Sequence, residues 1–214
     1  MISRDRAENE AKLLQESYPD AHCALDFTNA FTLLVATVLS AQTTDVRVNS
    51  ITPSLFAVAP DPISMATLSL DELEKIIYPL GTFRRKAVAL QGLAQKLCDD
   101  FDGVVPGTRE ELMSLPGVGR KTANVVLGNW FGYEEITVDT HVGRVTKRLK
   151  WQNAEDPLKA EKQLRELMPD APWTQLCHEI IFHGRRICHS RNPECGKCIL
   201  NELCDVGIER LAIS

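Results

Sequence analysis

A glycine-rich turn, a helix start and a lysine fall together within residues 115–123 of this 214-residue chain. Pro116 fixes one backbone angle, while Gly117 and Gly119 permit a tight turn and the close approach of another backbone. A helix is predicted from Lys121 onward, so the unpaired N–H groups at its positive end favour an anion such as a phosphate. The lysine then suits either of two tasks. It can hold that phosphate, or its amine can attack a nearby electrophile.

Two short helices flank this turn. The spacing of Thr108 and Glu111 is that of a capping box and predicts a helix that ends near Ser114. The unit is therefore a helix-hairpin-helix, although such turns also serve as plain DNA grips or as ordinary interhelical loops. Asp139 lies 18 residues after Lys121. Its carboxylate can stabilise a nearby positive charge and help to move protons, or it can simply cap the helix that follows.

Four cysteines near the C-terminus form a second pattern, C-x6-C-x2-C-x5-C, and they are Cys188, Cys195, Cys198 and Cys204. The polar, charged residues 1–6 predict no secretory signal, so metal-bound thiolates fit better than disulfides. A four-cysteine zinc site normally has two short C-x2-4-C pairs, whereas this pattern has one, and zinc is the alternative to an iron–sulfur cluster. None of the histidines has metal-ligand spacing. Three cysteines outside the pattern are expected to be inert core thiols: Cys23, Cys98 and Cys177.

The composition describes a globular protein in which any contact with nucleic acid must come from a local patch of charge. Hydrophobic residues make up 44% of the chain and charged residues 25%, and the net charge of −5 argues against coating nucleic acid by bulk charge. Two segments, residues 81–97 and 140–151, nevertheless hold basic residues and no acid. In the second segment one helical stripe is apolar, namely Val142, Val145 and Leu149. The stripe beside it is expected to reach a phosphate and comprises His141, Arg144 and Arg148.

Helical patterns account for nearly the whole chain, so the predicted fold class is all-α. Helices are expected over residues 4–17, 28–41 and 86–99, and Ser69 begins another with a capping box. The longest apolar run, residues 30–39, is too short to cross a bilayer. We therefore expect no membrane association and a cytoplasmic protein.

Taken together, the hairpin, Lys121, Asp139 and the cysteine spacing resemble the endonuclease III family of DNA glycosylases. The resemblance implies a [4Fe-4S] cluster on the four cysteines. It implies a bifunctional enzyme that removes oxidised pyrimidines from double-stranded DNA and cleaves abasic sites by β-elimination. It also implies a monomer with two helical domains flanking a DNA-binding cleft. Residues 26–133 would form a six-helix domain bearing the hairpin, and residues 1–25 with 134–214 a domain bearing the cluster.

The resemblance also assigns roles to individual residues. Lys121 is the expected nucleophile, assisted by Asp139, and the positive helix end and Arg120 favour its unprotonated amine. Gln42 matches the family residue that fills the gap left by a flipped base. Thr82 occupies a second wedge position, where family members often carry leucine. The other expected DNA-binding residues are Gly117, Val118, Gly119, Arg120, His141, Arg144, Arg148 and Arg191.

Other interpretations remain at this stage. Relatives that remove adenine opposite oxidised guanine resemble the same pattern but lack the hairpin lysine. The alternative within the superfamily is therefore a monofunctional adenine or mismatch glycosylase. An alternative of another class is a non-catalytic iron–sulfur DNA-binding protein, which the combination of Lys121 and Asp139 disfavours. A redox protein is a further alternative, disfavoured because no partner-docking or second-cofactor motif accompanies the cysteines.

Overall fold

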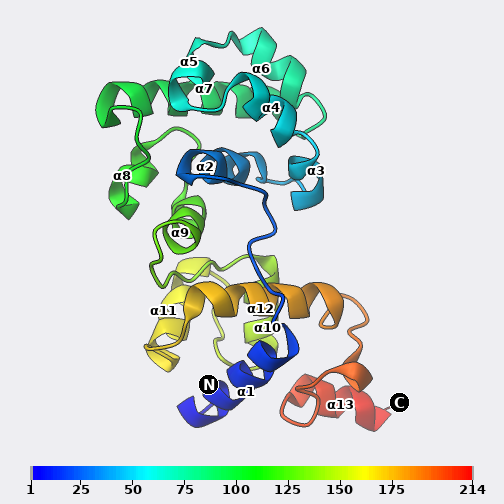
Figure 1. The fold of residues 1–214 in the computed structure, drawn as a ribbon. Helices are drawn as coiled ribbons and strands as arrows, with labels where there is room; N and C mark the ends of the chain where they lie inside the picture. Colours follow the sequence, from blue (N-terminus) through cyan, green and yellow to red (C-terminus); the bar gives the residue numbers. More distant parts are fainter. Residues whose placement is uncertain (1, 214) are drawn as a thin grey trace. The chain divides into compact units, whose positions relative to one another are not determined.

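The computed structural model describes residues 2–213, and within them every regular element is a helix and no strand occurs (Figure 1). The predicted all-α class is confirmed. The chain folds as two compact units, one formed by Cys23–Tyr133 and the other by Met1–His22 together with Glu134–Ser214. The first division falls after His22, whereas the sequence resemblance places it after residue 25.

The unit formed by Cys23–Tyr133, all of it described, holds eight α-helices where the resemblance implies six. The difference lies in short helices of five to seven residues, which are too brief for apolar periodicity to reveal. In chain order the helices are α2 (Ala30–Leu39), α3 (Asp45–Asn49), α4 (Thr52–Val58), α5 (Pro62–Thr67), α6 (Leu70–Ile77), α7 (Phe83–Phe101), α8 (Arg109–Ser114) and α9 (Arg120–Asn129).

Helix α2 forms the centre of this unit. Every residue from Phe31 to Leu39 is buried, as expected for a helix that is apolar on all sides. Its start is fixed by Asn29, whose side chain accepts from the Thr32 N–H while the Thr32 hydroxyl accepts from the Asn29 N–H. The core therefore forms around a helix whose ends are set by its own sequence.

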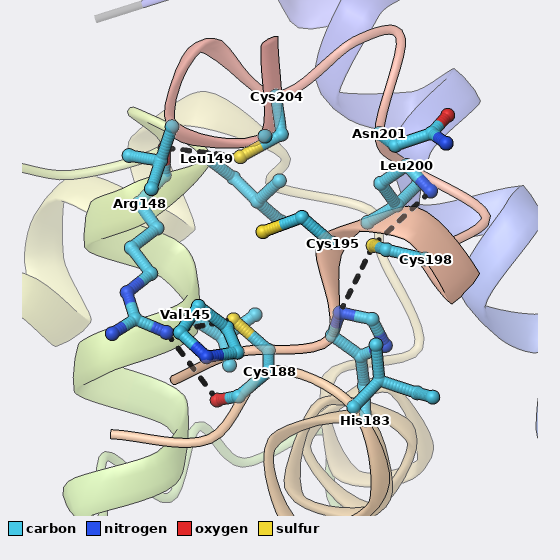
Figure 2. A pocket seen from close by; sticks show the side chains of 14 residues that line it. Val145, Arg148, Leu149, His183, Cys188, Cys195, Cys198, Leu200, Asn201 and Cys204 are labelled. Atoms are coloured by element: carbon cyan, nitrogen blue, oxygen red, sulfur yellow. Dashed lines mark hydrogen bonds between the residues drawn. The ribbon is translucent and has the colours of Figure 1, made fainter. Parts of the chain in front are cut away.

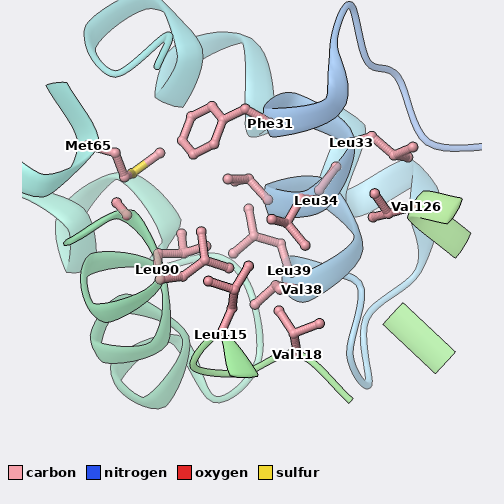
Figure 3. Packing of buried hydrophobic residues seen from close by; sticks show 14 of the residues in the cluster. Phe31, Leu33, Leu34, Val38, Leu39, Met65, Leu90, Leu115, Val118 and Val126 are labelled. Atoms are coloured by element: carbon pink, nitrogen blue, oxygen red, sulfur yellow. The ribbon is translucent and has the colours of Figure 1, made fainter. Parts of the chain in front are cut away.

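The hairpin is attached to this core by two apolar side chains. Leu115 and Val118 are 2% and 7% exposed, and Figure 3 shows them beside Val38 and Leu39 of α2. Burying each such side chain stabilises the fold by about 1.5–3 kcal/mol. The turn is therefore held rigidly from beneath while its glycines stay at the surface.

The second unit contains the two ends of the chain. Its described helices are α1 (Arg4–Ser17), α10 (Thr140–Arg148), α11 (Pro157–Leu167), α12 (Trp173–Arg186), the 3-10 turn η1 (Cys195–Lys197) and α13 (Asp205–Ile213). The core includes the predicted apolar stripe of α10, which is buried, and two fully buried tryptophans, Trp151 and Trp173.

A buried carboxylate fastens α1 to this unit. Glu10 is fully buried, and its two oxygens accept hydrogen bonds from Trp151 Nε1 at 2.6 Å and from Arg6 Nε at 3.0 Å. A buried carboxylate without such donors would cost several kcal/mol. Helix α1 is thus bound by a satisfied polar contact as well as by apolar packing. No helix within residues 2–213 combines the length and the apolar character needed to span a bilayer.

Candidate functional site

The helix-hairpin-helix predicted from the sequence is present. Helix α8 begins after Thr108, whose hydroxyl accepts from the Glu111 N–H and donates to the Glu111 carboxylate at 2.6 Å. Helix α9 begins at Arg120, with Gly119 as N-cap and no side chain capping its first N–H groups. An uncapped helix start favours a bound anion. The hairpin therefore has the backbone geometry expected of a phosphate-binding turn.

The two hairpin glycines are needed for different reasons. Gly117 has φ of +77°, and a Cβ placed on it would lie 2.9 Å from the Ala89 Cβ. Gly119 has φ of −95° and open space where its Cβ would be. Gly117 is thus required by the fold. Gly119 instead keeps the approach to the α9 start clear.

Lys121 lies in the first turn of α9, and its side chain is exposed. It forms no hydrogen bond or ion pair with any of the residues that the structure describes. Its amine is therefore available to a ligand or substrate, as the sequence predicts.

Val118 anchors the turn. Its side chain belongs to the hydrophobic core, and its backbone N–H donates to the Leu115 carbonyl at 3.1 Å. Contact of Val118 with DNA stays a prediction.

Asp139 serves as the N-cap of α10 and still keeps one oxygen available. Its Oδ1 accepts from the N–H groups of His141 and Val142, at 2.8 Å and 2.7 Å. No hydrogen bond from the described residues reaches Oδ2. The cap fixes the direction of the carboxylate, so the two roles weighed from the sequence are compatible.

Arg144 and Arg148 also depart from expectation. Arg144 donates to the carbonyl oxygens of Gly184 and Cys188, both at 3.0 Å. Arg148 donates to the His189 carbonyl at 2.7 Å and to the Cys188 sulfur at 3.1 Å. Both guanidinium groups therefore hold the cysteine loop against α10, and their contact with a phosphate stays a prediction.

Close approach of α10 to α12 depends on a glycine that the sequence did not single out. A Cβ on Gly184 would lie 3.0 Å from both Arg144 Nη2 and His141 Nδ1. His141 is half-buried, which lowers its pKa, and its Nδ1 lies 3.2 Å from Arg144 Nη2. His141 is thus placed beside the arginine that holds the loop, and contact with DNA stays a prediction for it.

The four cysteines of the C-terminal pattern line one pocket (Figure 2). The pocket wall between them is apolar and includes Val145, Leu149 and Leu200. Burial raises the pKa of the Cys198 thiol to about 11, so a thiolate there requires a compensating cation. Its sulfur also accepts a hydrogen bond from the Leu200 N–H at 3.4 Å. An all-sulfur donor set in an apolar pocket fits an iron–sulfur cluster.

Zinc fits this pocket less well. Tetrahedral zinc needs its sulfurs at about 2.3 Å from one point. Within residues 2–213, no group of three or more His, Cys, Asp or Glu side chains is arranged to hold a single metal ion. Outside the pocket, Cys177 is 2% exposed, which confirms its predicted place in the core, and burial raises its pKa to about 12.

His183 is a site residue that the sequence analysis missed. It is 2% exposed and lines the cysteine pocket from α12. Its Nδ1 lies 2.8 Å from the Tyr18 hydroxyl. Its Nε2 lies 3.7 Å from the Cys198 sulfur (Figure 2). Burial lowers its pKa to about 4. His183 could have been found from its position on the helix that leads into Cys188. Rules on the spacing of metal ligands do not consider such a residue.

The two predicted wedge residues share an unusual backbone conformation. Gln42 and Thr82 are exposed and have φ of 56° and 55°. This left-handed region is disfavoured for residues other than glycine, most of all for a β-branched residue such as threonine. Strain of this kind tends to mark functional positions. Arg191 is exposed on the cysteine loop. Contact of these three with DNA stays a prediction.

Comparisons with known proteins agree with this geometry. The model of the HhH-GPD superfamily of base excision DNA repair proteins matches residues 35–170, and that of the iron–sulfur binding domain of endonuclease III matches residues 188–204. The chain is 46% identical to endonuclease III of Synechocystis sp., covering 94% of this chain and 92% of that protein. It is 39% identical to endonuclease III of Escherichia coli K12, covering 90% and 91%. The chain belongs to the endonuclease III family.

Solved structures support the same assignment. A trapped endonuclease III–DNA covalent intermediate matches with a TM-score of 0.93 and 43% identity, over 99% of this chain and all of that one. A thermostable thymine-DNA glycosylase matches with a TM-score of 0.85 at 22% identity, which shows a shared fold. Endonuclease III family members are DNA glycosylase and abasic-site lyase enzymes of base excision repair. Their cofactor is a [4Fe-4S] cluster, and the match to the iron–sulfur binding domain spans the four cysteines of residues 188–204.

Proposed function

We propose that this chain is a bifunctional DNA glycosylase and abasic-site lyase that removes oxidised pyrimidines from double-stranded DNA. The observation that carries the proposal is the exposed amine of Lys121, which has no partner within the described residues and lies beside the glycine turn. A relative 43% identical to this chain has been trapped in a covalent intermediate with DNA. A lysine amine is the group that forms such an intermediate with a sugar.

In the proposed reaction the unprotonated Lys121 amine attacks the anomeric carbon of the damaged nucleotide. The bond between that carbon and the base breaks, and the base takes the electron pair and a proton. The bond between the anomeric carbon and the ring oxygen then breaks, and the ring oxygen takes its electron pair and the second proton from the nitrogen, which leaves an imine. Removal of a proton from the neighbouring carbon then expels the 3′ phosphate. Hydrolysis of the remaining imine returns the lysine.

Asp139 is the proposed partner in these proton transfers. Its Oδ1 is fixed by two backbone N–H groups of α10, and its Oδ2 is the oxygen proposed to stabilise positive charge on the sugar. The bound cluster supplies a covalent cross-link that fixes the loop of residues 188–204. We propose no redox step in base excision for it.

DNA binding is proposed to involve few phosphates. The uncapped start of α9 and the open face of Gly119 would hold one phosphate near the lesion. Arg191 would contact another, and Gln42 and Thr82 would fill the gap left by the flipped nucleotide. The enzyme is proposed to act as a monomer on chromosomal DNA in the cytoplasm.

A panel of damaged duplexes separates this function from its alternative. Duplexes with thymine glycol, with adenine opposite 8-oxoguanine and with a G·T mismatch would be assayed for base release and, without heat or alkali, for strand cleavage. The proposal predicts release and cleavage on the thymine glycol duplex, and Lys121→Ala as control should lose cleavage. Release of adenine or thymine from the other duplexes without cleavage would establish a monofunctional glycosylase.

A further inference from the structure

Lys86 is a buried cation with a single polar partner. Lys86 is 5% exposed, whereas its neighbours Arg84 and Arg85 are exposed. Its Nζ donates to the Thr43 hydroxyl at 2.7 Å, and no carboxylate of the described residues pairs with it. Burial lowers the pKa of Lys86. A methionine would fill the same space without this desolvation cost, so packing alone does not account for the ammonium group.

The position of Lys86 connects two loops that are distant in sequence. Its backbone N–H donates to the Thr82 carbonyl at 3.1 Å, while its side chain reaches Thr43, the residue after Gln42. The Thr43 N–H in turn donates to the Ser40 carbonyl at 3.0 Å. One residue thus bonds through its backbone to the loop of Thr82 and through its side chain to the loop of Gln42.

Both connected loops carry strain. Gln42 and Thr82 have left-handed backbone angles in the free protein, and such conformations persist only where surrounding contacts impose them. Two wedges that enter one gap in DNA must also keep a fixed separation. If each loop moved independently, binding would have to order both and would lose affinity.

We propose that Lys86 is a positioning residue that couples the two wedge loops, holding Gln42 and Thr82 at the spacing required to fill the gap beside a flipped nucleotide. The proposal rests on the proposed wedge function of those two residues. It assigns to the Lys86–Thr43 hydrogen bond a role in lesion recognition, because the contact orders both loops before DNA arrives.

The test is a double-mutant cycle on the cluster-loaded full chain. Lys86→Met, Thr43→Val and the double variant would be compared with wild type for affinity to a duplex with a tetrahydrofuran abasic analogue and to the undamaged duplex. We expect each single variant to bind the abasic duplex about 10-fold more weakly, which is about 1.4 kcal/mol. The double variant should be no weaker than either single, since all three lose one contact. Affinity for undamaged duplex should stay within about twofold of wild type.

Two further variants control for folding and charge. Thr43→Ser keeps the hydroxyl and should restore wild-type binding, and Thr43 is only half-buried, so the cycle does not depend on Lys86→Met alone. Lys96→Met removes a cation from the same helix, where it pairs with Asp100 at 2.9 Å, and should leave the ratio of the two affinities unchanged. When wild-type protein binds, the fluorescence of 2-aminopurine placed opposite the abasic analogue should rise. In the Lys86→Met and Thr43→Val variants this rise should be smaller.

The outcomes that overturn the proposal are distinct. Additive losses would show that Lys86 and Thr43 act separately, and equal losses on both duplexes would show that Lys86 contacts a phosphate. Gln42→Ala distinguishes this failure from failure of the wedge assignment. If Gln42→Ala weakens abasic binding and Lys86→Met does not, only the coupling is wrong. If neither has an effect, the wedge function itself fails.

Discussion

Replacing the two hairpin glycines one at a time separates what the fold requires from what DNA requires. Alanine at Gly117 must adopt φ of +77°, which costs about 1–2 kcal/mol for a residue with a Cβ. That Cβ would also lie 2.9 Å from the Ala89 Cβ, and overpacking of this kind costs about 1–3 kcal/mol. The expected loss in unfolding free energy is therefore about 2–5 kcal/mol.

Gly119→Ala is the matched substitution with the opposite outcome. Its backbone angle is ordinary and its Cβ meets no atom within 4 Å, so the stability cost of exchanging the N-cap glycine should stay below about 1 kcal/mol. The added methyl group instead enters the space through which a phosphate would approach. We expect affinity for damaged and undamaged duplex to fall alike, without loss of stability.

Urea unfolding and duplex titration of both variants provide the assay. A third variant, Gly117→Ala with Ala89→Gly, removes the close contact but not the backbone strain. Its stability should exceed the additive expectation from the two single variants by about 1–3 kcal/mol. Strict additivity, or equal destabilisation by Gly117→Ala and Gly119→Ala, would refute the distinction drawn from the geometry.

Three other predictions follow from the site. Anaerobically purified protein should contain about four iron and four sulfide per chain. Cys198→Ser should lower the iron content, the sulfide content and the stability of the protein. Stoichiometric zinc without sulfide would contradict the cofactor assignment. His178 lies on α12, where burial lowers its pKa to about 4, below its unfolded value near 6.5. The unfolded state therefore takes up a proton first as pH falls. The free energy of unfolding, measured by urea titration at both pH values, should therefore drop by roughly 1–3 kcal/mol between pH 6.5 and 4. The drop should be smaller in His178→Asn. An identical pH dependence in the variant would show that His178 is not its source. Thr82→Leu should bind the abasic duplex more tightly, as measured by titration, and weaker binding would show that Thr82 does not occupy the gap.

Helix boundaries were predictable where local sequence encodes them. Residues 4–17 form α1 as predicted, and Ser69 and Thr108 cap α6 and α8 because each hydroxyl accepts an N–H three residues along the chain. The same local rule placed Asp139 at the start of α10. Short helices such as α3 contain too few residues for periodicity, so their existence depends on tertiary packing.

The parts of the site that depend on distant residues were not predictable. Arg148 was placed on a basic stripe, but its hydrogen-bond partners are the carbonyl groups and the sulfur of a loop some 40 residues later. In the same way, the basic segment 81–97 gave no sign that Lys86 alone would be buried against Thr43. Local sequence specifies which side chains carry charge. Packing decides which of them face solvent.

Borohydride trapping on a duplex with one abasic site tests the central claim most directly. Wild-type protein should give a protein–DNA adduct that survives denaturation, and peptide mapping should place the DNA remnant on Lys121. Lys121→Ala should give no adduct while keeping the cluster and affinity for undamaged duplex. Asp139→Asn, which retains the helix cap, should trap more slowly. An adduct formed as efficiently by Lys121→Ala, or base release by wild type with no adduct at all, would contradict the account.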